Sequence, residues 1–317
     1  MPSAMTHAYF ADDVYRKLPS RVKQKVERDT MRIFAQGPDM FYYQFLSSKA
    51  RSFGKEMHSH KTKRFFETYI EYMKRYRLEK KKEAISAFYG FLLHYILDMK
   101  THPLIFYQTG SNTKNKNQSK NSHREMELLL DLYYMEKKEK KNPAIIRHDR
   151  YLFPTRTFSS SLEHLLDDTI MKTYRKEDMG KCYLKSMRKM RFVHRFLSYD
   201  PHGRKLKFYR ICDRLKLHRG KKWQYLSYAN DLRRKATYFN CEHNNWCYPV
   251  DASIEKTESF FELYEEAIEE AVMWISKFHD VFVGKEDVKE CMKDFPSNSY
   301  LTGVSEFKRT KMKYFKK

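Results

Sequence analysis

Two histidines and an aspartate stand four residues apart in the most apolar stretch of an otherwise polar chain. His94, Asp98 and His102 lie within residues 88–103, and Pro103 closes the stretch. Each step of four residues turns a helix by about 40°, so the three side chains share one narrow stripe. Because burying such groups without partners is costly, the stripe predicts metal ligands on a buried helix. The alternative is a pair of core histidines and a buried aspartate, each hydrogen-bonded to a neighbour.

Pro103 predicts where this helix ends. Proline cannot continue a regular helix and biases the preceding residue away from helical geometry. We therefore expect His102 to lie at a frayed helix end.

A second pair of candidate ligands repeats the same spacing downstream. His123 and Glu127 are four residues apart and share a helix face. A glutamate alone would be interpreted as a solvated surface charge. Beside His123, Glu127 is instead interpreted as the second member of a pair of metal ligands.

Two turns before the central stretch hold further candidates. Asp39 leaves a Gly37–Pro38 turn and enters an aromatic run. An aspartate in such a turn usually caps a helix, but its entry into an apolar segment favours a ligand role. His58 and His60 are two residues apart and cannot share a helical face, so we expect only one of them to point inward.

The composition predicts an all-α protein. The 317 residues include 41 % hydrophobic residues but only 9 Gly and 9 Pro, which argues against a β-sandwich or a glycine-looped nucleotide fold. The expected helices span 6–17, 21–35, 62–77, 124–139, 159–175, 179–198, 203–217 and 258–280, besides the central one.

The last of these helices opens with Ser259 and Glu262 in a capping-box pattern. No internal repeat and no sharp boundary is visible. We therefore expect one domain over 1–317, with a metal-ligand half 1–140, a C-terminal helical half 141–282 and a basic tail 308–317.

The net charge of +23 predicts attraction to polyanions, either nucleic acid or an anionic membrane surface. A Lys-rich composition without any such function is the alternative. Basic residues alternate with aromatic ones over 179–222, which is typical both of a nucleic-acid-binding face and of an ordinary amphipathic helix. The polar stretch 108–122 is expected to be a mobile loop between the two ligand pairs, and the basic tail is expected to be loose.

Cysteine usage and the N-terminus favour a cytoplasmic location. There are five cysteines without disulfide-like spacing, no apolar leader segment, and no apolar run long enough to span a bilayer. Cys241 and Cys247 flank His243, but this spacing is not that of a metal knuckle, so free thiols are expected.

These motifs together resemble the zinc-dependent phospholipase C family, whose all-helical fold is shared by single-strand-specific zinc nucleases. His7 with the aromatic residues after it resembles the N-terminal histidine of the family. Asp39 resembles the loop aspartate, and His58 the next histidine. The family's central helix and last ligand pair are matched by His94, Asp98, His102, His123 and Glu127.

The resemblance implies a cluster of up to three zinc ions. One ion would be held by Asp39, His58, His94 and Asp98, and a second by Asp98, His102, His123 and Glu127, so that Asp98 bridges the two. His7 and Glu127 would share a third ion. Imidazoles with carboxylates suit zinc independently of the resemblance.

The resemblance also implies phosphoester hydrolysis by a hydroxide held between two zinc ions, with Asp39 and Asp98 as catalytic residues. The expected partner is a phospholipid or nucleotide-type phosphoester, and no protein partner is inferred. A zinc nuclease or phosphatase on the same site is one alternative. A non-catalytic basic module that binds nucleic acid or anionic membranes is another.

Two departures from the family pattern lead to further expectations. Choline-specific members carry aromatic residues at the positions of Met40 and Lys55, so we expect poor hydrolysis of choline lipids. Secreted members complete the third metal site with a free N-terminus, but only six residues precede His7 here. We therefore expect two firmly held zinc ions and a weaker third that depends on the N-terminus.

Overall fold

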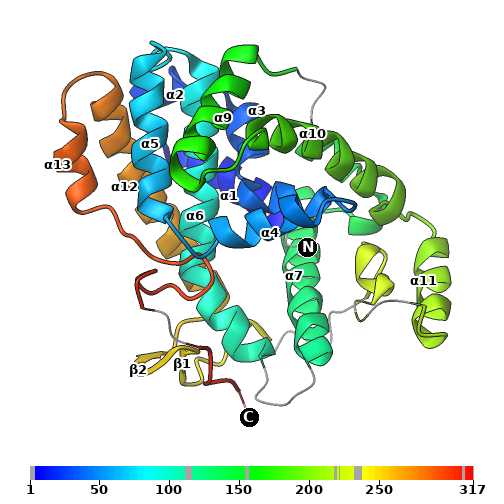
Figure 1. Ribbon diagram of the computed structural model, residues 1–317. Helices are drawn as coiled ribbons and strands as arrows, with labels where there is room; N and C mark the ends of the chain where they lie inside the picture. Colours follow the sequence, from blue (N-terminus) through cyan, green and yellow to red (C-terminus); the bar gives the residue numbers. More distant parts are fainter. Residues whose placement is uncertain are drawn as a thin grey trace.

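The chain is built almost entirely from helices, which confirms the all-α prediction (Figure 1). The computed structural model describes residues 4–110, 116–153, 157–217, 220, 222–231, 238–308 and 311–316. The α-helices are α1 (Ala4–Lys17), α2 (Ser20–Lys23), α3 (Arg28–Phe34), α4 (Ser48–Met57), α5 (Thr62–Arg75), α6 (Lys82–Thr109), α7 (Lys116–Glu139), α8 (His148–Leu152), α9 (Ser160–Tyr174), α10 (Met179–Phe192), α11 (Arg204–Arg214), α12 (Phe260–Phe282) and α13 (Val288–Lys293).

Shorter elements complete the fold. Three 3₁₀ turns and one π-helix connect the α-helices, and two antiparallel strands form a small hairpin: η1 (Gly37–Tyr43), η2 (Pro143–Ile145), η4 (Trp223–Leu226), the π-helix η3 (Val193–Ser198), β1 (Trp246–Tyr248) and β2 (Asp251–Lys256). The hairpin was not predicted from the sequence.

The central helix α6 forms the core of the structure. It packs against α3, α12, α1 and α7, and nearly all of its residues after Glu83 are buried up to Ile105. A helix that is apolar on all sides is stable only when other elements surround it. Helices from the N-terminal and the C-terminal parts of the chain therefore share one core around α6.

The prediction that this helix frays at His102 is wrong, because α6 continues through Pro103 to Thr109. A proline inside a helix costs about 3 kcal/mol. Leu104 and Ile105 are buried beyond it, and burying each such side chain contributes roughly 1.5–3 kcal/mol. Gly303 packs so close to Pro103 that a Cβ there would come within 2.8 Å of both the Met99 carbonyl and the proline ring. His102 is consequently held inside a buried helix.

The helix expected over 21–35 is divided into α2 and α3. Glu27 adopts an extended conformation at the start of α3, and its backbone N–H donates to Ser86 Oγ at 2.7 Å. In a continuous helix this N–H would donate to a backbone carbonyl of the preceding turn. Here it donates to a side chain of α6 instead, so the helix is interrupted.

The loop expected over 108–122 is also corrected, because α7 begins at Lys116; residues 111–115 lie outside the described part. Asn121 pairs with the Gly220 carbonyl and the Lys222 N–H. These tertiary hydrogen bonds override the weak helix propensity of the segment. The expectation of a loose tail is not met within residues 311–316, because Lys313 and Tyr314 both donate to the Pro249 carbonyl.

The other expected helices are found within a few residues of their predicted ends. The capping box between Ser259 and Glu262 is present at the start of α12. None of the five cysteines, all of which lie in the described residues, forms a disulfide. In the described part of the chain, no helix is both long and apolar enough to cross a membrane.

Candidate metal centre

The eight candidate ligands converge from five elements of the fold. Helix α6 provides His94, Asp98 and His102 from one stripe; His7 comes from α1, Asp39 from η1, His58 from the residue after α4, and His123 and Glu127 from α7. Seven of the eight are buried, and His123 is partly exposed. Of His58 and His60, only His58 points inward, since His60 is exposed.

Asp98 lies between the imidazoles of His7 and His94. Its Oδ1 is 3.2 Å from His7 Nε2, and its Oδ2 is 3.1 Å from His94 Nε2. The two rings stack with their centroids 4.3 Å apart. The two oxygens of Asp98 thus face different imidazoles.

A second ligand group shares His94. His58 Nε2 is 3.3 Å from Asp39 Oδ1 and 3.5 Å from His94 Nε2. Donor atoms of Asp39, His58 and His94 all lie within 4.8 Å of one another, as do those of His7, His94 and Asp98.

The third group lies where α6 and α7 run side by side (Figure 1). It consists of His102, His123 and Glu127, whose donor atoms also lie within 4.8 Å of one another. His123 Nε2 is 3.0 Å from Glu127 Oε1. The imidazoles of His102 and His123 stack at 5.8 Å, and Phe106 covers His123 at 4.7 Å.

Backbone carbonyls fix the orientation of three of the imidazoles. The Nδ1 atom of His58 lies 2.6 Å from the Gly54 carbonyl. His94 Nδ1 lies 3.0 Å from the Ala35 carbonyl. Likewise, His102 Nδ1 lies 3.0 Å from the Tyr300 carbonyl.

A carbonyl can only accept, so each Nδ1 carries the proton and each Nε2 presents a lone pair to the cluster. This arrangement is typical of histidine ligands to a metal.

Acceptor atoms therefore face one another in a buried space. Asp98 Oδ2 has no hydrogen-bond partner within the described residues, although the Nε2 atoms of His58 and His94 lie 3.8 and 3.1 Å away. The His102 Nδ1–H lies 3.4 Å away but donates to the Tyr300 carbonyl. A buried carboxylate oxygen without a donor is strongly unfavourable. A cation between these atoms removes that cost, and the imidazole and carboxylate donors are those that zinc prefers. The residues present thus fit a zinc centre.

The electrostatics of the centre show the same need for positive charge. Burial alone would raise the pKa of Asp98, but His102, His94 and His7 together hold that pKa well below its usual range. The pKa of Glu127 is also lowered. Burial alone would raise this pKa, but the neighbouring His123 lowers it. Burial disfavours charge on His7, yet Asp98 raises the pKa of His7 above its ordinary value.

Gly37 allows the η1 turn to approach α6 closely. Its φ is +48°, and a Cβ at this position would lie 2.3 Å from the ring of His94. Glycine is therefore required next to His94 both for backbone conformation and for space. The turn that places Asp39 in the centre depends on this contact.

A pocket of about 660 Å³ opens onto part of the centre. Asp39, His58, His102, His123 and Glu127 line it, whereas the other three candidates lie deeper. Its remaining walls contain cationic and aromatic or apolar side chains, one serine and no carboxylate: Tyr42, Phe45, Arg51, Lys55, Phe106, Ser119, Lys120, Arg124, Trp223, Leu226 and Leu301. The pocket thus gives an exogenous molecule access to two of the three ligand groups.

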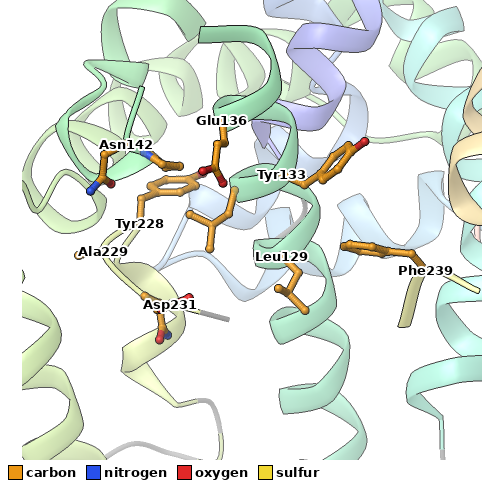
Figure 2. Close-up of a pocket in the computed structure, with 11 residues that line it drawn as sticks. Leu129, Tyr133, Glu136, Asn142, Tyr228, Ala229, Asp231 and Phe239 are labelled. Atoms are coloured by element: carbon orange, nitrogen blue, oxygen red, sulfur yellow. The ribbon is translucent and has the colours of Figure 1, made fainter. Parts of the chain in front are cut away.

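A second pocket, of about 470 Å³, lies on the face of α7 opposite His123 and Glu127 (Figure 2). Leu129, Tyr133 and Glu136 of α7 point into it together with Tyr228 and Phe239. None of the eight candidate ligands lines it. It is therefore not part of the metal centre.

A family model described as zinc-dependent phospholipase C matches residues 6–180, which is more than half of the chain. The chain belongs to this family. The match contains all eight candidate ligands. No curated protein and no solved structure matched the chain.

Family members of this type are zinc-dependent hydrolases of phosphoesters, and the buried ligand groups are consistent with zinc binding here. The place of His7 differs from the grouping that the resemblance implied. His7 lies with His94 and Asp98, and no contact joins it to Glu127 in the described part. The expectation about the N-terminus concerns residues 1–3, which lie outside the described residues.

Sequence reasoning missed several residues that position the ligands. Asp131 accepts hydrogen bonds from the backbone N–H and the hydroxyl of Thr6, at 2.8 and 2.9 Å, and from the Tyr228 hydroxyl at 2.7 Å. It therefore satisfies free donors in the first turn of α1, next to His7. Asp131 follows Glu127 by four residues, and this continued spacing was a signal that could have revealed it. No local signal pointed to Tyr300.

We expect the metal-free protein to lose stability as the pH rises above 6.5, the ordinary pKa of histidine. The pKa values of His7 and His58 are raised in the folded state, so their contribution is complete below 6.5 and is lost as the pH passes the folded pKa values. Histidines with lowered pKa values, such as His102, His148 and His194, are neutral in the folded state. They oppose this trend only within about one pH unit above 6.5, where the unfolded state loses its remaining histidine protons.

The zinc-loaded protein should show the opposite trend between pH 6.5 and about 8, because fewer protons then compete with the metal for imidazole nitrogens. Melting temperatures measured across this range, with and without a chelator, test the expectation. The expectation would be contradicted if the melting temperature changed with pH in the same way with and without the chelator.

Proposed function

We propose that this protein is a phospholipase C that uses zinc to cleave the phosphodiester bond of anionic lipids. The observation that carries the proposal is the set of buried acceptor atoms around Asp98, at the base of a pocket with cationic walls. A buried cation satisfies the acceptors, and the cationic walls suit a substrate with negative charge.

Bound zinc would lower the pKa of a coordinated water and neutralise charge on the phosphate. The protein residues hold and orient that chemistry. His58, His94 and His102 keep their Nε2 lone pairs aimed inward because backbone carbonyls fix their other nitrogens. This fixed arrangement reduces the reorganisation needed when the phosphate enters.

Asp39 is the carboxylate best placed for proton transfer. Of the two carboxylates assigned to catalysis, only Asp39 lines the pocket, while Asp98 lies beneath it. We assign Asp39 to accept a proton from the attacking water. We assign Asp98 to join the ligand group of His58 and His94 to that of His102.

The pocket walls favour an anionic substrate with an apolar part. Lys55 is exposed at the pocket and has no ion-pair partner among the described residues. Arg51 donates to the backbone carbonyls of Gln44 and Phe45, and Arg124 to that of Lys222. None of these three cations is neutralised by a carboxylate contact within the described part. Phe106 and Leu226 provide apolar walls for an acyl or glycerol portion.

The aromatic cage needed for choline is arranged differently from the expectation. Met40 is fully buried and does not line the pocket, so its identity does not decide the headgroup. Tyr42 does line the pocket and stacks on His58 with 5.8 Å between centroids. Lys55 remains the residue that opposes a quaternary ammonium.

A zinc nuclease is the second candidate function. The same cations would bind a nucleic-acid backbone, and Trp223 in the pocket wall could stack on a base. A non-catalytic binding module is disfavoured, because such a module has no need of eight convergent ligands.

Replacing Asp98 by Asn should abolish hydrolysis and lower zinc content, because a neutral amide cannot bridge two cations. We expect a loss of activity of at least about 100-fold, in the range seen when groups essential for electrostatic stabilisation are removed. Glu136→Gln is the control, since Glu136 is an exposed carboxylate on α7 and lies on the face opposite His123 and Glu127. The readouts are elemental analysis of protein purified without added metal and hydrolysis of a phosphodiester panel. An Asp98→Asn protein with full zinc and activity would refute the bridging role.

Reversing the charge of Lys55 should shift the headgroup preference. We expect Lys55→Glu to lower kcat/KM for phosphatidylglycerol by about tenfold and to lower it less, or to raise it, for phosphatidylcholine. Lys49→Glu on the same helix α4 is the control, because Lys49 is exposed but does not line the pocket. If both variants change the two substrates equally, the wall does not select the headgroup.

A further inference from the structure

An apolar surface rimmed by basic residues lies directly beside the pocket. We call it the α10 patch; it comprises Phe45, Leu46, Arg188, Lys189, Phe192, Arg195 and Phe196. Leu46 is 99 % exposed, and Phe192 is 55 % exposed. Side chains of this kind in contact with water usually mark an interaction site when they gather in one place.

Contacts within the α10 patch show that its members do gather. Phe45, Leu46 and Phe192 line one groove of about 370 Å³ together with Arg188 and Lys189. The rings of Phe192 and Phe196 lie 4.9 Å apart, and the Arg195 guanidinium lies 5.0 Å from the Phe196 ring centroid. The patch therefore joins the loop before α4 to the end of α10 and the π-helix η3.

The charge of the patch is entirely positive. Residues 179–198 contain six Lys or Arg residues and no Asp or Glu. Lys189 donates to the neutral Gln44 side chain rather than to a carboxylate. Clusters of basic residues around exposed apolar side chains are typical of surfaces that bind anionic membranes.

The patch is continuous with the pocket that opens onto the metal centre. Phe45 lines both the groove of the patch and that pocket. A flat surface seated on the patch would consequently lie next to the pocket mouth. A lipid headgroup leaving that surface would have only a short distance to travel.

We propose that the α10 patch binds the surface of an anionic lipid bilayer and inserts Leu46 and Phe192 into its interfacial layer. The aliphatic Leu46 is the most exposed side chain of the patch and cannot stack on a nucleic-acid base, which favours a bilayer over a nucleic acid. That the protein cleaves lipids of the bound membrane rests on the proposed phospholipase function, but membrane binding itself does not.

Vesicle cosedimentation tests the binding directly with the zinc-loaded protein. The vesicles consist of phosphatidylcholine with or without phosphatidylglycerol. We expect binding to require phosphatidylglycerol, and the double variant Leu46→Ser, Phe192→Ser to lower the partition coefficient by about 100-fold, or about tenfold for each apolar side chain lost. Phe307→Ser is the control, since Phe307 is 81 % exposed outside the patch. Equal binding of the double variant and the wild-type protein would overturn the proposal.

Two further measurements separate the possible outcomes. Cleavage of a soluble short-chain phosphodiester should be unchanged in the double variant while cleavage of vesicle lipid falls. If patch-dependent vesicle binding is found but no lipid is cleaved, the proposed function fails and the membrane surface stands. If Arg188→Gln weakens binding of a single-stranded oligonucleotide but leaves vesicle binding intact, the patch is a nucleic-acid surface and the proposal is overturned.

Discussion

The structure depends on a group of acceptor atoms that are buried facing one another. Asp98 Oδ2 lies beside the Nε2 atoms of His58 and His94 and accepts no hydrogen bond from the described residues, because the nearby His102 Nδ1–H donates to the Tyr300 carbonyl. Without a cation, the desolvation of this carboxylate would oppose folding by several kcal/mol, on the order of the penalty for an uncompensated buried charge. Metal binding and folding should therefore be coupled, as they are in small zinc proteins.

Segments far apart in the sequence cooperate to maintain this arrangement. The carbonyls that orient His58 and His94 come from Gly54 and Ala35, inside the part that matches the family, whereas the carbonyl that orients His102 comes from Tyr300. Tyr300 also donates its backbone N–H to the His58 carbonyl at 3.0 Å. The C-terminal part of the chain, although outside the family match, is thus required for the geometry of the centre.

The four-residue spacing was enough to predict that His94, Asp98 and His102 share one helix face, and that His123 and Glu127 share another, because a helix fixes the relative directions of residues four apart. His7 was predicted only from the family resemblance. The spacing could not show how the groups divide, since the positions of His7 and Asp39 depend on the approach of α1 and η1 to α6. The course of α6 beyond Pro103 was mispredicted because burial of Leu104 and Ile105 outweighs a local proline penalty.

The start of α7 was also predicted too late in the chain. Asn121 forms hydrogen bonds with residues about 100 positions away, and the local sequence does not reveal such contacts. Local propensity predicts an element correctly only where tertiary contacts do not compete with it.

Anomalous diffraction above and below the zinc absorption edge, from crystals of protein purified without added metal, tests the central claim most directly. The account predicts a peak about 2.0–2.2 Å from the Nε2 atoms of His58 and His94 and from carboxylate oxygens of Asp39 and Asp98, and another between His102, His123 and Glu127. Well-ordered side chains in the present arrangement without an anomalous peak among them would contradict it.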